Sequence, residues 1–423
     1  MDYAPDSGNT AWVLISTALV LFMTPGLAFF YGGMVRAKHV LGMLMQNFFA
    51  MGLIAVLWVL IGFSLAFGGA GAGGLIGNLD FVGFRDVFLV PPGGADGFFR
   101  ATVGLSIPFV LYAAYQMTFA IITPALITGA TADRLKFSAY ALFIGLWSVL
   151  VYAPVANWVF GGGWLFALGA FDFAGGAVVH MNAGAAALAL VLLLGPRRGY
   201  PQEPMPPHNL PLTLIGTGIL WFGWAGFNGG SALAADVVAS QAILNTFVAA
   251  SAAMLGWLCV ERLRNGRATT LGAASGAVAG LVAITPCAGF VGALSAIAIG
   301  AIAGVVCYLA LGLKRALELD DSLDVIAVHL MGGLVGSLLL GIFADNRINP
   351  FALGDTNGLL FGGGAQLLVA QAIAAVATLV FSFAMSLAIG KVIDITLGLR
   401  VAETDEVEGL DRSQHAEAGY TLV

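Results

Sequence analysis

Apolar stretches of about 20 residues recur along the whole chain, and they restrict it to a membrane fold. About 20 helical residues span the ~30 Å hydrocarbon core of a bilayer. Charged residues make up only 9% of the 423 residues, whereas soluble domains carry about 25%. Water cannot solvate a surface with so little charge, so the sequence predicts an all-α polytopic membrane protein in contact with the lipid bilayer.

Eleven stretches are predicted to cross the membrane, and the last is long enough to extend beyond it. They are residues 8–33, 40–68, 101–128, 137–158, 173–195, 210–230, 239–260, 269–287, 289–312, 325–344 and 364–398. Alternating strands with turn signals about every ten residues are absent, which excludes a β-barrel. We expect a transmembrane domain at residues 1–400 and an acidic cytoplasmic tail at residues 401–423.

Basic residues predict the orientation. Eleven spans put the two termini on opposite sides of the membrane. Of the 17 Lys and Arg residues, the loops on one side hold only Arg85, Arg100 and Arg347, and the other 14 lie in the alternate loops and the tail. Because Lys and Arg gather on the cytoplasmic side, we expect the N-terminus outside and the C-terminus inside a cell (cytoplasmic or inner) membrane.

Charge and cysteine content exclude several functions. The net charge is −6, so the chain offers no basic surface for nucleic acid. Cys259, Cys287 and Cys307 lie in apolar stretches without metal-ligand spacing, which argues against a disulfide framework and against a metal site. We expect no catalytic residues and no cofactor, and therefore no enzyme.

Two pairs of similar segments suggest an internal repeat. FYGG (30–33) ends the first predicted span and FNGG (227–230) ends the sixth. VVHMNAG (178–184) lies in the fifth span and AVHLMGG (327–333) in the tenth. Five helices separate the copies, so the halves would run in opposite directions, as in transporters whose substrate path lies between inverted repeats. We expect an inverted five-helix repeat plus a long last helix.

Two histidines lie inside these apolar helices. His180 and His329 occupy equivalent places in the two segments, and an ionisable group in lipid is a candidate functional site because its desolvation is expensive. A single membrane histidine is as often a satisfied core residue, but a symmetric pair favours function. His39, His208 and His415 lie in polar segments and are expected to be solvated or interfacial.

Two aspartates begin the helices that carry this pair. Asp172 precedes the fifth span and Asp324 the tenth, where a carboxylate caps free N–H groups. Capping is a sufficient explanation for Asp324. Asp172 lies about 12 Å along the helix from His180, at the outer mouth of any path, where its field would also attract cations. Both roles remain open for Asp172.

Aromatic side chains gather at the same outer level. They are Tyr115, Phe119, Tyr152, Phe160, Trp164, Trp224 and Phe227. Their position alone favours an aromatic belt at the membrane interface. The functional alternative is a vestibule whose rings bind a cation through cation–π interactions. Ser231 follows FNGG directly and offers a hydroxyl acceptor beside them.

Together these residues resemble the ammonium transporter family (Amt/Mep, related to the Rh proteins). Almost the whole chain takes part in the resemblance, and the matching segments occur in the family's order. They are TPGLAFFYGGMVRAK, YQMTFAIITPALI, VYAPVANWVFGGGWL, FDFAGGAVVHMNAG, FGWAGFNGGSALAA, SGAVAGLVAITPCAGFVG and SLDVIAVHLMGG. The tail resembles that of the bacterial or archaeal Amt type.

The resemblance implies a homotrimer in which each subunit encloses its own narrow pore. His180 and His329 match the twin histidines of that pore. Phe119 and Phe227 match the two phenylalanines that close its outer end. Ammonium would lose a proton at the apolar entrance, and ammonia would then pass the histidines, with or without the proton.

The resemblance also implies an outer site that recruits ammonium. Ser231 matches the serine of that site, with Trp224 nearby. Asp172 matches an aspartate that supports the vestibule. Tyr115 and Tyr152 match aromatic positions around the mouth.

Two positions depart from the family pattern. Phe160 stands where Trp is usual, and Phe is the weaker cation–π partner, so the strength of recruitment is in question. Leu330 follows His329 where Gly is usual, which would narrow or re-orient the inner half of the pore.

Regulation and alternatives follow from the same resemblance. The tail and cytoplasmic loops would dock a PII-type (GlnK) regulatory protein, and Asp321 and Asp324 would meet a basic residue of its loop. An ammonium sensor with little or no transport is the main alternative. A haem enzyme and an Rh-like channel for other small neutral solutes are weaker ones.

Overall fold

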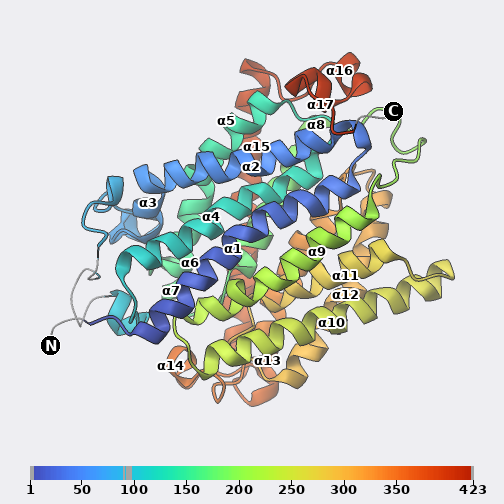
Figure 1. The fold of residues 1–423 in the computed structure, drawn as a ribbon. Coiled ribbons are helices and arrows are strands. Elements are labelled where there is room, and N and C mark those ends of the chain that lie inside the picture. Colours follow the sequence, from blue (N-terminus) through green and yellow to red (C-terminus); the bar gives the residue numbers. More distant parts are fainter. Residues whose placement is uncertain (1–3, 89–90, 92–97, 421–423) are drawn as a thin grey trace.

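The computed structural model describes residues 4–88, 91 and 98–420, and helices form most of it (Figure 1). The α-helices are α1 (Ser7–Met34), α2 (Val40–Leu57), α3 (Phe63–Phe67), α4 (Phe109–Thr131), α5 (Phe137–Trp147), α6 (Ala153–Phe160), α7 (Trp164–Ala167), α8 (Asn182–Leu194), α9 (Leu210–Trp224), α10 (Val237–Asn265), α11 (Thr270–Ile284), α12 (Ala293–Ala316), α13 (Met331–Phe343), α14 (Pro350–Leu353), α15 (Gln366–Thr396), α16 (Glu403–Glu408) and α17 (Leu410–His415). Two short strands, β1 (Ala70–Gly71) and β2 (Ile76–Gly77), pair antiparallel.

Wider π-helical turns interrupt or precede several of these helices. They are η2 (Trp58–Gly62), η6 (Phe98–Thr102), η7 (Ser148–Tyr152), η8 (Gly176–Met181), η9 (Ala225–Gly229) and η11 (Ile326–Leu330). Tighter 3-10 turns are η1 (Ala37–His39), η3 (Ala72–Gly74), η4 (Val82–Phe84), η10 (Gly230–Ala232) and η12 (Leu359–Phe361). Because π-helical turns are rare and often occur at functional sites, η8, η9 and η11 mark the segments of interest.

Ten helices in the described part of the chain are long and apolar enough to cross a membrane. They are Ser7–Met34, Ala37–Phe67, Phe109–Thr131, Phe137–Ala167, Gly176–Leu194, Leu210–Ala232, Val237–Asn265, Ala293–Lys314, Ile326–Phe343 and Gln366–Thr396. The predicted span at residues 269–287 corresponds to α11, which is apolar but has only 15 residues. The all-helical membrane class is confirmed, whereas the eleventh crossing and the orientation stay predictions.

The longer helices run roughly alongside one another, and their small residues allow close approach. In Figure 1, α1, α9, α10 and α12 lie in neighbouring rows. A side chain at Gly300 or Gly304 of α12 would collide with the backbone of α10 at Ala249 or Ala253. Small residues let membrane helices pack backbone to backbone, which accounts for part of the high glycine content of 58 residues.

The acidic tail folds back onto the helix ends. α16 and α17 lie at the end of the bundle opposite the start of α1, which we call the tail end (Figure 1). The Leu410 N–H donates to His39 Nδ1 at 3.2 Å, and the Gly42 N–H donates to the Asp411 carboxylate at 2.8 Å. His39 is only 2% exposed, so its predicted solvation is wrong because the tail covers it.

Ion pairs connect the loops at the tail end. Arg197 bonds to Asp320 at 2.8 Å and lies 3.5 Å from Asp133, while Arg400 bonds to Glu406 of the tail at 2.7 Å. Burial favours the neutral form of Asp320, but the Arg197 guanidinium outweighs it and holds the pKa of that carboxyl below its usual value. The tail is therefore tied to the bundle through charged groups.

Candidate functional site

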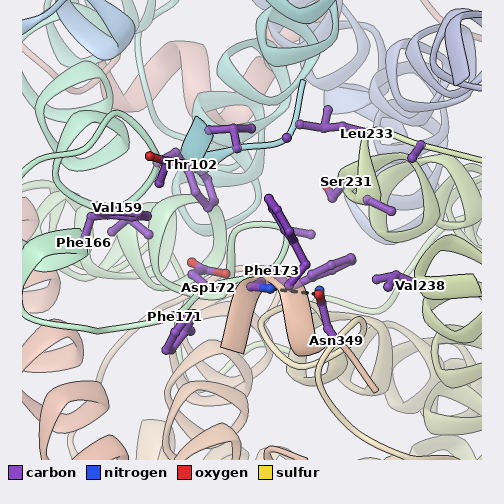
Figure 2. Close-up of a pocket in the computed structure, with 18 of the residues that line it drawn as sticks. Thr102, Val159, Phe166, Phe171, Asp172, Phe173, Ser231, Leu233, Val238 and Asn349 are labelled. Carbon is purple, nitrogen blue, oxygen red and sulfur yellow. Dashed lines mark hydrogen bonds between the residues drawn. The ribbon is translucent and has the colours of Figure 1, made fainter. Parts of the chain in front are cut away.

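A cavity of about 390 Å³ opens at the end of the molecule opposite the tail (Figure 2). Phe119, Phe160 and Ser231 line it, as do the carboxylates of Asp172 and Asp236. None of the described residues that line it is Lys, Arg or His. A cavity that combines carboxylates and aromatic rings without a basic group favours cations.

Two phenyl rings close the floor of this cavity. The ring centroids of Phe119 and Phe227 lie 4.5 Å apart. Phe119 faces the cavity, whereas Phe227 lines a much smaller chamber beneath it. The pair that the sequence placed at the outer gate therefore separates two spaces.

A hydroxyl network fixes the turn that carries Phe227. Ser231 donates to the Phe227 carbonyl at 2.8 Å. The Tyr115 hydroxyl lies 2.8 Å from the Gly226 carbonyl and 3.2 Å from the Ser231 hydroxyl. Tyr115 is fully buried and is not part of the cavity wall. It therefore supports the Ser231 hydroxyl from behind the cavity wall, and its part in recruitment stays a prediction.

Trp224 and Tyr152 also lie away from the predicted recruitment site. Trp224 stacks on His180 at 5.5 Å between ring centroids, and its indole N–H donates to Thr285 at 3.0 Å. It lines the chamber below Phe227, because the last turn of α9 points inward at this position. Tyr152 is buried beside Trp58. Of the five residues predicted for recruitment, Phe160 and Ser231 line the cavity.

Several residues of the cavity wall were missed by sequence reasoning. Gln116, Phe173 and Asn349 line it (Figure 2 labels the last two). Gln116 carried a usable signal, because it is a polar residue inside the third predicted span. Asn349 comes from the loop after α13, and no local pattern indicated that this loop returns to the mouth.

The chamber beneath the phenyl rings is narrow and largely apolar. Its free volume is about 10 Å³, which is close to the space that one water molecule needs. Its wall is apolar except for the indole of Trp224, whose N–H is already bonded, and the imidazoles of His180 and His329. A hydrated ion does not fit, whereas a neutral molecule of the size of water does.

The two imidazoles meet in this chamber. The Nδ1 atoms of His180 and His329 are 3.3 Å apart, and the rings are stacked with 5.3 Å between centroids. When both rings are neutral, one Nδ1 must donate and the other accept, so the two rings hold opposite tautomers. One Nε2 is then an acceptor and the other a donor. The Nε2 of His180 is buried and has no hydrogen-bond partner.

Both histidines sit on π-helical turns with an aspartate at the N-terminal end. Asp172 accepts from the N–H groups of four residues, 175 to 178, at 2.7 to 3.3 Å. Asp321 accepts from the N–H groups of Val325 and Ile326 at 3.1 and 2.7 Å. Each aspartate lies eight residues before its histidine, so the two caps occupy equivalent positions.

The cap of the second turn is therefore not the predicted one. The side chain of Asp324 bonds to Lys314, and its backbone φ is +65°. Asp321 takes the capping role and is fully buried. Burial raises the pKa of Asp321 to about 6. Asp321 is thus covered in the single chain, and its contact with a docked protein stays a prediction.

The two histidine segments also pack against each other in a reciprocal way. Gly184 lies four residues after His180, and a side chain there would collide with Leu330. Gly333 lies four residues after His329, and a side chain there would collide with Met181. Leu330 is buried in this contact and does not line the chamber, and its effect on the inner half of the pore stays a prediction.

Known proteins resemble this chain over nearly its full length. The family model of the Ammonium Transporter Family matches residues 11–420. An ammonium transporter of Mycobacterium tuberculosis (strain ATCC 25618 / H37Rv) is 51% identical over 434 aligned positions, covering 98% of this chain and 91% of that protein.

Solved structures have the same fold. Saccharomyces cerevisiae Mep2 superposes with a TM-score of 0.86 at 36% identity, covering 94% of this chain and 88% of that chain. A structure named Sensor Amt Protein superposes with a TM-score of 0.85 at 30% identity, covering 96% of this chain and 98% of that chain. The family pattern and these relatives extend over nearly the full length, and the chain therefore belongs to the ammonium transporter family.

Proposed function

We propose that this chain recruits ammonium in the open cavity, deprotonates it at the phenyl pair and conducts ammonia past His180 and His329. As a member of a transporter family, the chain is not an enzyme. The observation that carries the proposal is the contact between the two imidazoles in a water-sized chamber behind the Phe119–Phe227 pair.

Recruitment follows from the chemistry of the cavity. Ammonium is held by the face of Phe160 through a cation–π interaction and by the hydroxyl oxygen of Ser231. The carboxylates of Asp172 and Asp236 raise its local concentration. Because Phe is the weaker π-donor, we expect a weaker recruitment site than one with Trp at position 160.

Selectivity follows from the size and apolar wall of the chamber. Potassium resembles ammonium in size and charge but has no proton to lose. An apolar passage rejects any ion because its desolvation is too expensive. Ammonium escapes this barrier by releasing a proton to water in the open cavity, and ammonia then finds one donor and one acceptor Nε2 on the imidazole pair.

The wider architecture is part of the same proposal. The chain crosses the cell membrane eleven times, with α11 as the eighth crossing, the cavity outside and the tail in the cytoplasm. The reciprocal glycine contacts and the equivalent caps support an inverted repeat. Three copies form the trimer, and a PII-type protein docks at the tail end, where Asp324 is still partly exposed.

The decisive experiment is an ammonium pulse on proteoliposomes, with current recorded on a supported membrane. A potassium pulse and empty vesicles serve as controls. A saturable ammonium current without a potassium current supports electrogenic transport. If no current appears, an internal pH dye distinguishes electroneutral ammonia flux from no flux. No flux of either kind in folded protein contradicts the proposal.

An ammonium sensor is the second candidate function. The similarity to the structure named Sensor Amt Protein and the presence of Phe160 favour it. A sensor would bind ammonium and change the protease sensitivity of the tail while vesicles show neither current nor pH change. Transport at a rate well above that of empty vesicles would exclude it.

A further inference from the structure

The turns that precede His180 and His329 carry different residues at the position with a positive φ. Gly175 and Asp324 each lie five residues before their histidine, and both have positive φ, +121° and +65°. Both carbonyls accept the N–H group four residues later, at 2.8 and 2.9 Å. Both turns thus pass through a positive φ at this position, with values that differ by 56°. Glycine adopts it freely, whereas a residue with a side chain adopts it at a cost, which aspartate tolerates better than most.

Lys314 contacts both ends of the second turn. Its ammonium group donates to the carboxylate of Asp324 and, at 2.7 Å, to the carbonyl of Asp321. It reaches them from the end of α12, a separate helix. The side chains of Lys314 and Asp324 are 16% and 22% exposed, so water weakens this ion pair less than it would on an open surface.

The clamped turn leads directly to the pore. The Asp321 carboxylate caps the first N–H groups of η11, and His329 is the fourth residue of that turn. The segment is bonded at Asp321 and Asp324, and the Leu323 N–H also donates to the Gly129 carbonyl at 3.0 Å. We therefore expect a shift of the turn at Asp324 to displace the imidazole ring.

We infer that Lys314 is a positioning residue for His329. It keeps Asp324 in the left-handed conformation and thereby keeps the His329 ring in contact with His180. Lys314 does not line the chamber that holds the two imidazoles. The inference deepens the proposed transport function and rests on it for one of its two tests.

The first turn needs no such clamp and provides an internal control. Neutral contacts anchor it, whereas the second turn combines such contacts, for example from the Leu323 N–H to the Gly129 carbonyl at 3.0 Å, with the lysine. The Phe173 N–H donates to the Pro286 carbonyl at 3.1 Å, and the Gln371 amide forms two bonds of 2.8 Å with the backbone of Phe171. A change at Lys314 should therefore leave this turn undisturbed.

The first test is hydrogen exchange of K314M, followed by mass spectrometry. We expect exchange of the peptide at residues 321–330 to rise roughly tenfold and that of residues 172–181 to stay unchanged. The K314M/D324G double variant should restore slow exchange, since glycine needs no clamp. K391M is the matched control, because it breaks an exposed Lys–Asp pair at the same end of the molecule.

The second test is the ammonium current of the same proteins, expressed per folded protein. K314M should lower it roughly three- to tenfold, D324G should leave it within about twofold, and the double variant should recover it. If K314M does not fold, K314M/D324G decides the test. The inference then requires that this double variant folds and carries an ammonium current close to that of the unmodified protein.

Unchanged exchange at residues 321–330 in K314M overturns the inference, as does failure of D324G to rescue. Absence of current in the unmodified protein contradicts the proposed function, but it leaves the exchange test valid. The two claims are thus separable.

Discussion

The two turns that carry the pore histidines reach the same geometry with different chemistry. The turn before His180 uses glycine, neutral anchors and a carboxylate that caps four N–H groups. The turn before His329 uses a left-handed aspartate, a lysine clamp and a carboxylate that caps two. The first faces the open cavity and the second faces the tail end with its ion pairs. The comparison teaches that two backbone turns with different anchors can bring their imidazoles into contact, one without and one with an ion pair.

The largest expected effect comes from removing what the two turns share. The double variant H180L/H329L leaves ammonia without a hydrogen-bond partner in a desolvated chamber. We expect the ammonium current to fall at least about tenfold, or its selectivity over potassium to be lost. Currents in proteoliposomes measure both.

H208L is the matched control, because it removes an imidazole at the tail end, outside the chamber. Its current should stay within about twofold of the unmodified protein. A folded double variant with normal current and normal selectivity would remove the histidines from the mechanism.

The second largest expected effect is a difference in stability loss between variants of the two capping aspartates, Asp172 and Asp321. D172A leaves four N–H groups without an acceptor and D321A leaves two. Unsatisfied buried donors cost about 1–3 kcal/mol each, with compensation by water. We therefore expect thermal unfolding in detergent to show a loss of about 3–5 kcal/mol for D172A and about half of that for D321A.

D6A is the control for this pair of variants, since Asp6 caps α1 through one exposed bond to Asn9. It should cost at most about 1 kcal/mol. The comparison fails if D321A is as destabilising as D172A.

A pH effect is expected from the buried cap. Burial raises the pKa of Asp321 to about 6, against about 3.9 in an unfolded chain. Between these values the folded state holds more protons than the unfolded state, so the stability of the protein falls as the pH rises from 4 to 6. D321N has no carboxyl group to titrate at this position. Its melting temperature minus that of the unmodified protein should therefore rise as the pH increases from 4 to 6.

D345N provides the opposite sign. In the unmodified protein, the hydrogen bond from Arg347 lowers the pKa of the Asp345 carboxyl. The stability that this carboxylate contributes is therefore lost as the pH falls through the lowered pKa, and D345N lacks that contribution. Melting curves of D321N and the unmodified protein that stay parallel from pH 4 to 6 would contradict the assignment.

The smallest effect concerns the cavity. F160W offers a stronger cation–π face worth about 0.5–1 kcal/mol. We expect the half-saturating ammonium concentration to fall about two- to fivefold with an unchanged maximal current. F247W, on the exposed side of α10, is the control. An unchanged half-saturation would show that the ring at position 160 does not contact the ion.

Much of this molecule could be predicted from its sequence because lipid permits few backbone solutions. Most predicted spans agree with the helices within about five residues. The exceptions are the third, whose helix begins at Phe109 instead of 101, the fourth, whose helix extends to Ala167 instead of 158, and the short α11. The pairing of His180 with His329 followed from two short similar segments. These features depend on hydrophobicity and spacing, which the sequence displays directly.

Other features depend on backbone paths that no local pattern reveals. Trp224 belongs to the chamber because of the inward direction of the last turn of α9. Asp321 caps the second turn, although Asp324 lies nearer to the helix, because the positive φ of Asp324 turns its side chain toward Lys314. His39 is buried because a segment 371 residues later folds over it.

The bond between the two Nδ1 atoms has a consequence for any proton that takes the same route as ammonia. A proton that enters at one Nε2 and leaves at the other shifts the shared proton between the rings and leaves each imidazole in its opposite tautomer. The pair then cannot pass a second proton in the same direction until both tautomers have been restored. The tautomers of the two imidazoles would therefore record the last proton transfer. The return of both rings to their starting tautomers, and not the transfer itself, would limit how fast protons pass.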